Sequence, residues 1–78
     1  MAKKIFRLTF PEELIQEPIV YRLGHEFQVV ANIFRAAVAE KNSWIVLQLD
    51  GEEEEILRSI EFMRDMGVRV EERSASEF

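Results

Sequence analysis

Two hydrophobic periodicities alternate along the chain, in an order that few folds can accommodate. A repeat of two, typical of a half-buried strand, is followed by a repeat of about 3.6, typical of a helix with one apolar side. The strand pattern then occurs twice in succession, and a second helix pattern and a short strand pattern complete the 78 residues. The sequence therefore predicts the order strand, helix, strand, strand, helix, strand.

The predicted strands are stretches in which side chains alternate between two sides. In residues 4–10 the two sides are Phe6, Leu8 and Phe10, and Ile5, Arg7 and Thr9. In residues 44–50 they are Ile45, Leu47 and Leu49, and Trp44, Val46, Gln48 and Asp50. A longer apolar strand is predicted over about residues 28–40, and a short one begins at residues 68–70. The turn-forming run EKNS between the two middle strands indicates a hairpin.

The predicted helices each have one apolar side and recognisable ends. Pro18 suits the first position of a helix, which then continues to about residue 27. A second helix is predicted over residues 52–66, with Gly67 at its C-cap. Between the first strand and the first helix, a single helical turn is expected around Glu12 to Ile15.

The element order predicts an α+β fold of the ferredoxin-like βαββαβ type. Right-handed crossovers around the central hairpin place both helices on one face of a four-stranded antiparallel sheet, in the order four, one, three, two. The strand over residues 28–40 is then at an edge, where Val30 and Ile33 carry no charge to prevent pairing with another chain. A chain of this size buries only about 60% of its unfolded surface, so covering this edge would stabilise it. We therefore predict a homodimer.

Composition excludes several classes of function. The chain has no Cys and one His, so thiolate metal sites, iron–sulfur ligation and redox couples are absent, and no metal or cofactor is expected. The net charge of −5 argues against a nucleic-acid partner, because phosphates would repel the protein. No apolar run is long enough for a signal peptide or a membrane span, so we expect a cytoplasmic protein without direct membrane insertion. One domain over residues 1–73 and a flexible tail over 74–78 are expected.

No catalytic pattern is present in the sequence. The run DGEEEEI over residues 50–56 lacks the alternating ligands of a calcium loop, and carboxylates in the first turn of a helix favour the positive end of its dipole. His25 lies one helical turn after Tyr21, with no second His or nucleophile, so we expect a surface role for His25. Tyr21 is expected to pack, with its hydroxyl in contact with water. The three glycines stand alone, which excludes a phosphate-binding loop. We predict that the protein is not an enzyme.

Asn32 and Arg35 are polar residues inside the otherwise apolar strand VVANIFRAAV. Strict alternation puts Asn32 on the same side as Val30, Phe34, Ala36 and Val38, the side expected to be buried. A buried amide without partners would cost about 1–3 kcal/mol. Three explanations remain open: a bulge turns Asn32 outward, its amide bonds backbone at a strand end, or a ligand or partner chain satisfies it.

Several stretches of the chain also resemble a known family. LTFPEELIQEPIVYRL, VVANIFRAAV and MGVRVEE, with an Asp-Gly pair before an acidic helix start, resemble the NIL domain over about residues 3–72. The family takes its name from an Asn-Ile-Leu run in the second strand. Here the run is Asn32, Ile33 and Phe34, so Phe replaces Leu at the third position and changes the shape there.

The resemblance implies an ACT-like, ferredoxin-like regulatory domain. Members of the family occur in ATPase subunits of methionine-import ABC transporters, where they dimerise and bind methionine, and others precede ferredoxin modules in proteins of sulfur assimilation. Met1 directly before the first strand resembles the second arrangement. The resemblance implies that Asn32 faces the ligand, with Ile33, Phe34 and Arg35 beside it. It also implies an ABC transporter or ferredoxin-type protein as a partner.

Two hypotheses follow from these observations. The first is a regulatory domain that binds methionine or a related sulfur amino acid at a dimer interface. The second is a non-catalytic interaction module that docks onto a partner protein through its edge strand, in sulfur or methionine metabolism. Asn32 separates the two hypotheses, because it contacts ligand only in the first.

Overall fold

The computed structural model describes residues 1–14, 18–39 and 41–74. Its elements in chain order are β1 (Ala2–Pro11), η1 (Glu12–Leu14), α1 (Ile19–Glu26), β2 (Val29–Ala37), β3 (Asn42–Gly51), α2 (Glu53–Met66) and β4 (Arg69–Arg73). The predicted order of strands and helices is confirmed. Ile15 and residues 75–78, which belonged to the predicted helical turn and to the predicted tail, lie outside the described residues.

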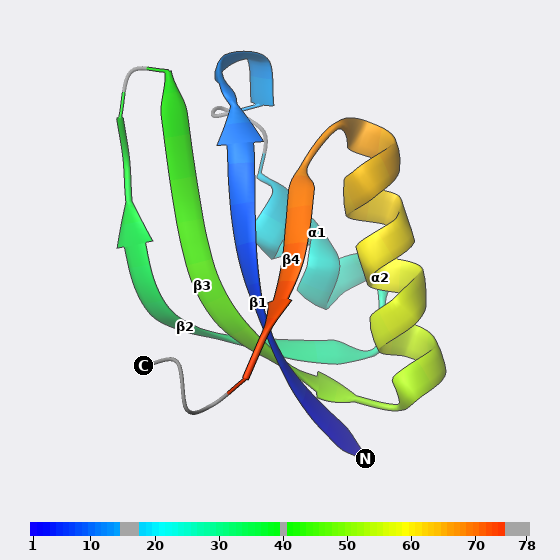
Figure 1. The fold of residues 1–78 in the computed structure, drawn as a ribbon. Helices are drawn as coiled ribbons and strands as arrows, with labels where there is room; N and C mark the ends of the chain where they lie inside the picture. Colours follow the sequence, from blue (N-terminus) through cyan, green and yellow to red (C-terminus); the bar gives the residue numbers. More distant parts are fainter. Residues whose placement is uncertain (15–17, 40, 75–78) are drawn as a thin grey trace.

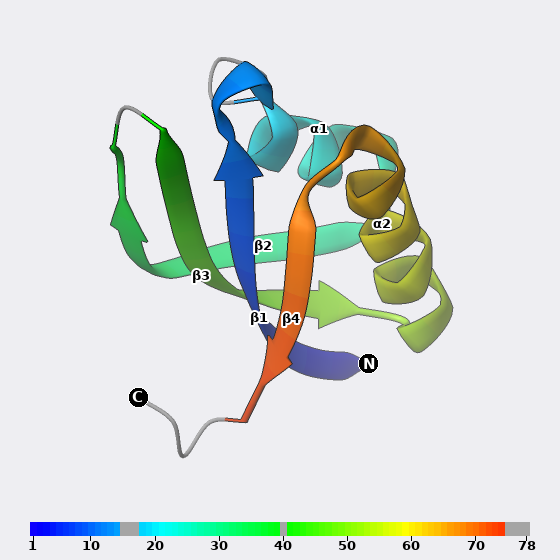
Figure 2. The ribbon, with the colours of Figure 1, turned by 45° about the horizontal axis from the view of Figure 1, so that its top comes forward.

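The four strands form one antiparallel sheet in the order β2-β3-β1-β4, and both helices lie on the same side of it (Figure 1). A view from a second direction shows α1 behind the curved sheet and α2 beside β4, with no helix drawn in front of the sheet (Figure 2). This is the predicted strand order read from the other edge. The ferredoxin-like prediction is therefore confirmed, and β2 and β4 are the two edge strands.

The core lies between the sheet and the two helices. The alternation predicted for β1 and β3 is confirmed at the core, because Phe6, Leu8 and Phe10 of β1 and Leu47 and Leu49 of β3 are buried against the helices, with Ile45 partly buried beside them. α1 contributes Ile19 and Leu23, and α2 contributes its apolar stripe. The buried apolar residues of this core are Phe6, Leu8, Phe10, Ile19, Leu23, Val29, Leu47, Leu49, Ile56, Ile60, Met63, Val68 and Val70.

The acidic start of α2 is used in local contacts. The Glu53 carboxylate pairs with the Lys4 ammonium at 3.1 Å, and the Glu55 carboxylate accepts a hydrogen bond of 3.1 Å from the Gln28 backbone N–H. Glu55 also pairs with Arg58 one turn later. These contacts join the start of the helix to β1 and to the residue that precedes β2, in addition to the favourable interaction of carboxylates with the helix dipole.

The ends of the elements differ from the predictions by a few residues. Pro18 is the N-cap of α1 instead of its first helical residue. β2 ends at Ala37, earlier than predicted. Gly67 has a φ of 103° at the end of α2, and the N–H of Val68 donates to the Met63 carbonyl, so the predicted C-cap is confirmed.

Candidate functional site

The predicted site residues lie on β2, a strand with a free edge. β2 pairs with β3 alone among the strands of the described chain. Its exposed apolar side chains are Val30 (59% exposed), Ile33 (53%) and Phe34 (47%), and Val38 follows the strand at 84%. The prediction of an apolar edge strand is thus confirmed. Pairing of this edge with a second copy stays a prediction.

A β-bulge interrupts β2 in the middle of the predicted site. Ile33 is opposite Leu47, but the next pair joins Arg35 to Val46, so Phe34 is the extra residue of the bulge. Asn32, before the bulge, is opposite Gln48. Because cross-strand partners share a face of the sheet, Asn32 and Arg35 both lie on the face opposite the helices. An uninterrupted strand would have put two residues three positions apart on opposite faces.

The prediction that Asn32 lies on the buried side is wrong. Val29 is the buried residue at the start of β2, and it fixes a parity in which Val30 and Asn32 point away from the helices. Asn32 is exposed, and so is Arg35. The bulge comes after Asn32, so it does not turn Asn32 outward. What it does is bring Arg35 to the same face.

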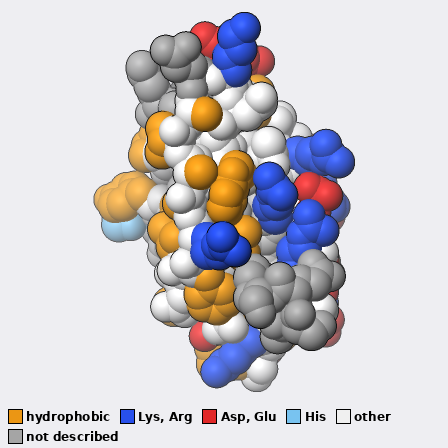
Figure 3. Space-filling model, turned by 60° about the vertical axis from the view of Figure 1, so that its left-hand side comes forward, with side chains coloured by type: hydrophobic (Ala, Val, Ile, Leu, Met, Phe, Trp, Pro, Cys, Tyr) orange, Lys and Arg blue, Asp and Glu red, His pale blue; other side chains and the backbone are white. Residues whose placement is uncertain are grey.

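The face of the sheet opposite the helices is here called the outer face. The cross-strand register places basic residues of three strands on this face. They are Lys3 and Arg7 of β1, Arg35 of β2, and Arg69 and Arg73 of β4. The acidic strand residues on it are Asp50 and Glu71. Figure 3 shows Lys and Arg side chains gathered beside a hydrophobic stripe on the side of the molecule that β2 and β3 occupy. A basic surface thus exists in a chain whose net charge is −5.

Arg7 is a candidate residue that the sequence did not single out. It lies on the outer face of β1, opposite Val46, and its guanidinium carbon is 5.1 Å from the centre of the Trp44 ring. Its Nε is buried and has no hydrogen-bond partner among the described residues. The sequence placed Arg7 and Val46 on the polar sides of their strands, but only the strand register shows that they are neighbours.

An apolar pocket of about 200 Å³ opens on the helix side, between α1 and the hairpin of β2 and β3. Its lining residues are Phe10, Ile19, Val20, Ala36, Ala37, Val38, Ser43 and Ile45. The Ser43 hydroxyl in this lining donates to the Ala39 carbonyl at 3.4 Å. None of the four predicted site residues lines this pocket. The structure therefore does not bring Asn32 and Arg35 together with this apolar cavity.

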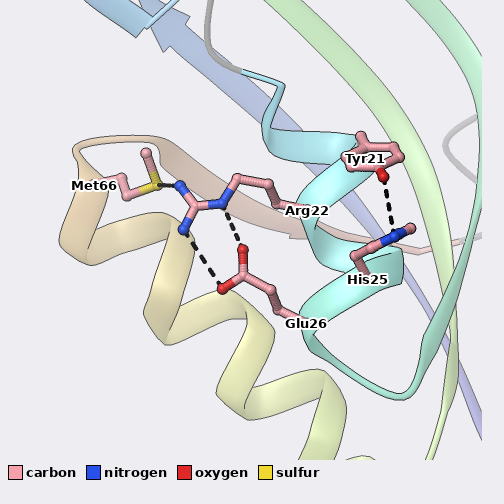
Figure 4. Close-up of polar contacts among 5 residues, drawn as sticks. All are labelled: Tyr21, Arg22, His25, Glu26 and Met66. Atoms are coloured by element: carbon pink, nitrogen blue, oxygen red, sulfur yellow. Dashed lines mark hydrogen bonds and ion pairs between the residues drawn. The ribbon is translucent and has the colours of Figure 1, made fainter.

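The exposed side of α1 carries two local contacts (Figure 4). The Tyr21 hydroxyl and His25 Nε2 are 3.0 Å apart, and the two rings stack at 4.3 Å between centroids. Arg22 pairs with Glu26 and reaches α2, where its Nη1 is 3.8 Å from the Met66 sulfur. The surface position expected for His25 is confirmed, whereas Tyr21, expected to pack, is 63% exposed and contacts His25 instead of the core. The contact of Arg22 with Met66 connects the two helices.

The described residues were also compared with the requirements of a metal site and of a membrane-spanning helix. Among residues 1–14, 18–39 and 41–74, no three His, Cys, Asp or Glu side chains are grouped so that they could hold a metal ion. In the same part of the chain, no helix combines the length and the apolar character needed to cross a bilayer.

Comparisons with known proteins match this chain to a family. The family model described as the NIL domain matches residues 4–72 of the sequence. The chain is 28% identical over 72 residues to the methionine import ATP-binding protein MetN of Bacillus subtilis (strain 168), a match that covers 87% of this chain and 21% of that relative. The chain thus spans about a fifth of the length of the curated relative.

A solved structure gives the same result at the level of the fold. The C-terminal domain of an ABC transporter ATP-binding protein from Enterococcus faecalis superposes with a TM-score of 0.79 at 32% identity. The superposition covers 92% of this chain and 84% of that domain. By the family match over nearly its whole length, supported by this fold, the chain belongs to the NIL domain family.

Proposed function

We propose that this NIL domain is a non-catalytic regulatory module that binds methionine or a related sulfur amino acid. The curated relative that it matches is a methionine import ATP-binding protein. A domain of this kind would sense the amino acid in the cytoplasm and act on a transporter ATPase or ferredoxin-type partner. No phosphate-binding loop or thiolate set is present in the sequence, so any ATPase or iron–sulfur chemistry would belong to the partner.

One observation carries the proposal: the bulge at Phe34 places the Asn32 amide and the Arg35 guanidinium on one exposed face. Within the described residues, neither side chain has a hydrogen-bond or ion-pair partner. An amide offers both donors and an acceptor, and a guanidinium offers a fork of donors, so the two together match the ammonium and carboxylate groups of an amino acid. Ile33 and Phe34 add exposed apolar surface beside them.

A second copy of the domain would complete the site. Asn32 and Arg35 stand on an open sheet face, where a small ligand would stay largely in water, whereas ligand sites normally bury most of the ligand. Pairing of two copies along their β2 edges would place side chains of the second copy beside Val30 and Asn32 on the same face of one continuous sheet. A ligand held between two copies favours the paired form, so binding and dimerisation are coupled.

The test is an amide NMR titration of the domain with L-methionine, with Asn32→Ala as the critical variant. We expect saturable shifts centred on residues 30–36 in the wild type and their loss in Asn32→Ala. Asn42→Ala is the matched control, because Asn42 is also an exposed Asn but lies at the far end of β3, opposite Pro11. If millimolar methionine moves no resonance in the folded wild-type domain, methionine is not the ligand.

The free apolar edge of β2 supports a second function, docking onto a partner protein without a ligand. Addition of a strand to such an edge supplies backbone hydrogen bonds, and exposed Ile33 and Val30 would supply apolar contacts. In this case methionine has no effect on association, and Ile33→Lys blocks it. Sedimentation velocity of the domain with and without methionine separates the two functions.

A further inference from the structure

Two arginines flank one buried residue on the outer face. Val46 at the centre of β3 is opposite Arg7 on one neighbouring strand and opposite Arg35 on the other. Neighbouring strands are about 4.8 Å apart, so the backbones at Arg7 and Arg35 are separated by roughly 10 Å across Val46. Val46 is only 7% exposed although the helices lie on the other side of the sheet. Long side chains that start on either side of it can therefore meet over an apolar floor.

The donors of these arginines are not used within the described chain. Arg35 has no hydrogen-bond or ion-pair partner there, and the Nε of Arg7 is buried without an acceptor. A buried donor that is left unpaired costs about 1–3 kcal/mol, more when the group is charged. A site of this kind gains most from an acceptor with negative charge, because charge-assisted hydrogen bonds are about twice as strong as neutral ones.

The acidic residues of the outer face are engaged elsewhere. Glu71 is opposite Arg7 on β4, but its carboxylate pairs with Arg69 and Arg73, each at 3.6 Å. The Asp50 carboxylate accepts a hydrogen bond of 2.8 Å from the Gln48 amide. No ion pair of the described residues therefore connects an internal carboxylate to Arg7 or Arg35. Among residues 1–14, 18–39 and 41–74, therefore, no carboxylate occupies the space between the two guanidinium groups, and a bound anion would supply the acceptor.

We infer that Arg7 and Arg35 form a carboxylate-binding subsite over Val46, next to Asn32. The inference rests on the proposed function for the identity of the ligand, and it adds which atoms of the amino acid are recognised. The carboxylate lies between the two guanidinium groups, Asn32 contacts the ammonium group, and the apolar side chain of the ligand extends away from the arginines. The Arg7 guanidinium already lies over the Trp44 ring, and this cation–π contact restrains its position.

The experiment follows the Nε–H resonances of Arg7 and Arg35 by NMR during titration with three compounds. L-methionine is the full ligand, N-acetyl-L-methionine keeps the carboxylate without the free amine, and L-methioninol keeps the amine without the carboxylate. We expect methioninol to bind at least about tenfold more weakly than L-methionine, and Arg35→Gln to weaken L-methionine by a similar factor.

Arg7→Lys separates charge from hydrogen-bond geometry at the second arginine. It keeps the positive charge but removes the planar fork, and we expect about tenfold weaker binding of L-methionine. Arg58→Gln is the matched control, because Arg58 is an exposed arginine on α2, away from the outer face, and its loss should leave binding unchanged.

Each outcome decides between the two proposals. If L-methionine and methioninol bind equally and both arginine variants behave as wild type, the subsite is refuted while the proposed function stands. If N-acetyl-L-methionine shifts both arginine resonances and L-methionine does not bind, the proposed function fails and the subsite stands. If neither carboxylate shifts the resonances at millimolar concentration, both proposals fail.

Discussion

β2 is the more apolar of the two strands β1 and β2 in the sequence, but β1 is the strand that supplies most of their buried residues. β1 is paired along both sides, to β3 from Ala2 to Pro11 and to β4 from Ile5 to Thr9, and its alternation is unbroken. β2 is paired on one side alone, and its register shifts at Phe34. Leu8 in β1 is fully buried, whereas Ile33 in β2 is 53% exposed even though it is on the helix side.

The difference shows where this fold tolerates irregularity. A bulge in β1 would have to be matched by two neighbouring strands, and it would move core side chains to the outer face. A bulge in β2 affects one neighbour and changes only which side chains are presented at the edge. The central strand therefore carries the stability of the domain, and the edge strand is free to carry the candidate site.

The largest expected effect is on the central strand. We expect Leu8→Ala to lower the free energy of unfolding by about 2–5 kcal/mol, because it leaves a cavity in the core. The equivalent change on the edge strand, Ile33→Ala, should cost under about 1 kcal/mol, since half of that side chain is already in water. Urea denaturation followed by circular dichroism measures both. Equal costs would show that β2 is as deeply packed as β1.

A second prediction concerns the contact that fixes the start of β2 against the end of β3. A Cβ at Gly51 would lie 2.7 Å from the Gln28 carbonyl oxygen, so Gly51→Ala forces the backbone of this pair apart. We expect a loss of about 1–3 kcal/mol in the same denaturation experiment. Gly24→Ala is the control: a Cβ there meets nothing within 4 Å, and α1 should gain up to about 1 kcal/mol.

The smallest effect on stability is expected at the exposed edge itself. Val30→Lys should change the free energy of unfolding by under about 0.5 kcal/mol but reduce self-association, because it puts a charge beside the free edge. Leu57→Lys on α2 is the control, since Leu57 is an exposed apolar residue of similar accessibility (52% against 59%) away from the edge. Sedimentation equilibrium measures association. Wild-type protein that remains monomeric at high concentration would contradict the dimer.

Most of the fold could be predicted from the sequence, but only part of the candidate site. The sides of β1 and β3, the stripe of α2 and the Gly67 cap all follow from local spacing, and the structure has them as predicted. Asn32 and Arg35 were recognised as unusual, but the side of Asn32 was predicted wrongly. The choice of parity in β2 depended on whether Val29 or Val30 is buried, and two adjacent valines give no periodic signal.

Arg7 shows the second limit of prediction from sequence. Nothing near it in the chain distinguishes it from an ordinary arginine on the polar side of a strand. Its importance comes from Val46 and Arg35, which are 39 and 28 positions away in the sequence and become neighbours through the strand register. The signal that could have identified Arg7 is the register itself, and the register depends on all three strands together.

The sequence by itself determined the order of elements, the core side of β1 and β3 and the edge position of β2, because periodicity and chain connectivity leave few arrangements. The tertiary structure alone decided which face Asn32 and Arg35 share and what lies between Arg35 and Arg7. A bulge forms where leaving one residue out of the ladder makes the pairing of a strand with its neighbour more stable. The stability of that pairing depends on the partner strand as much as on β2.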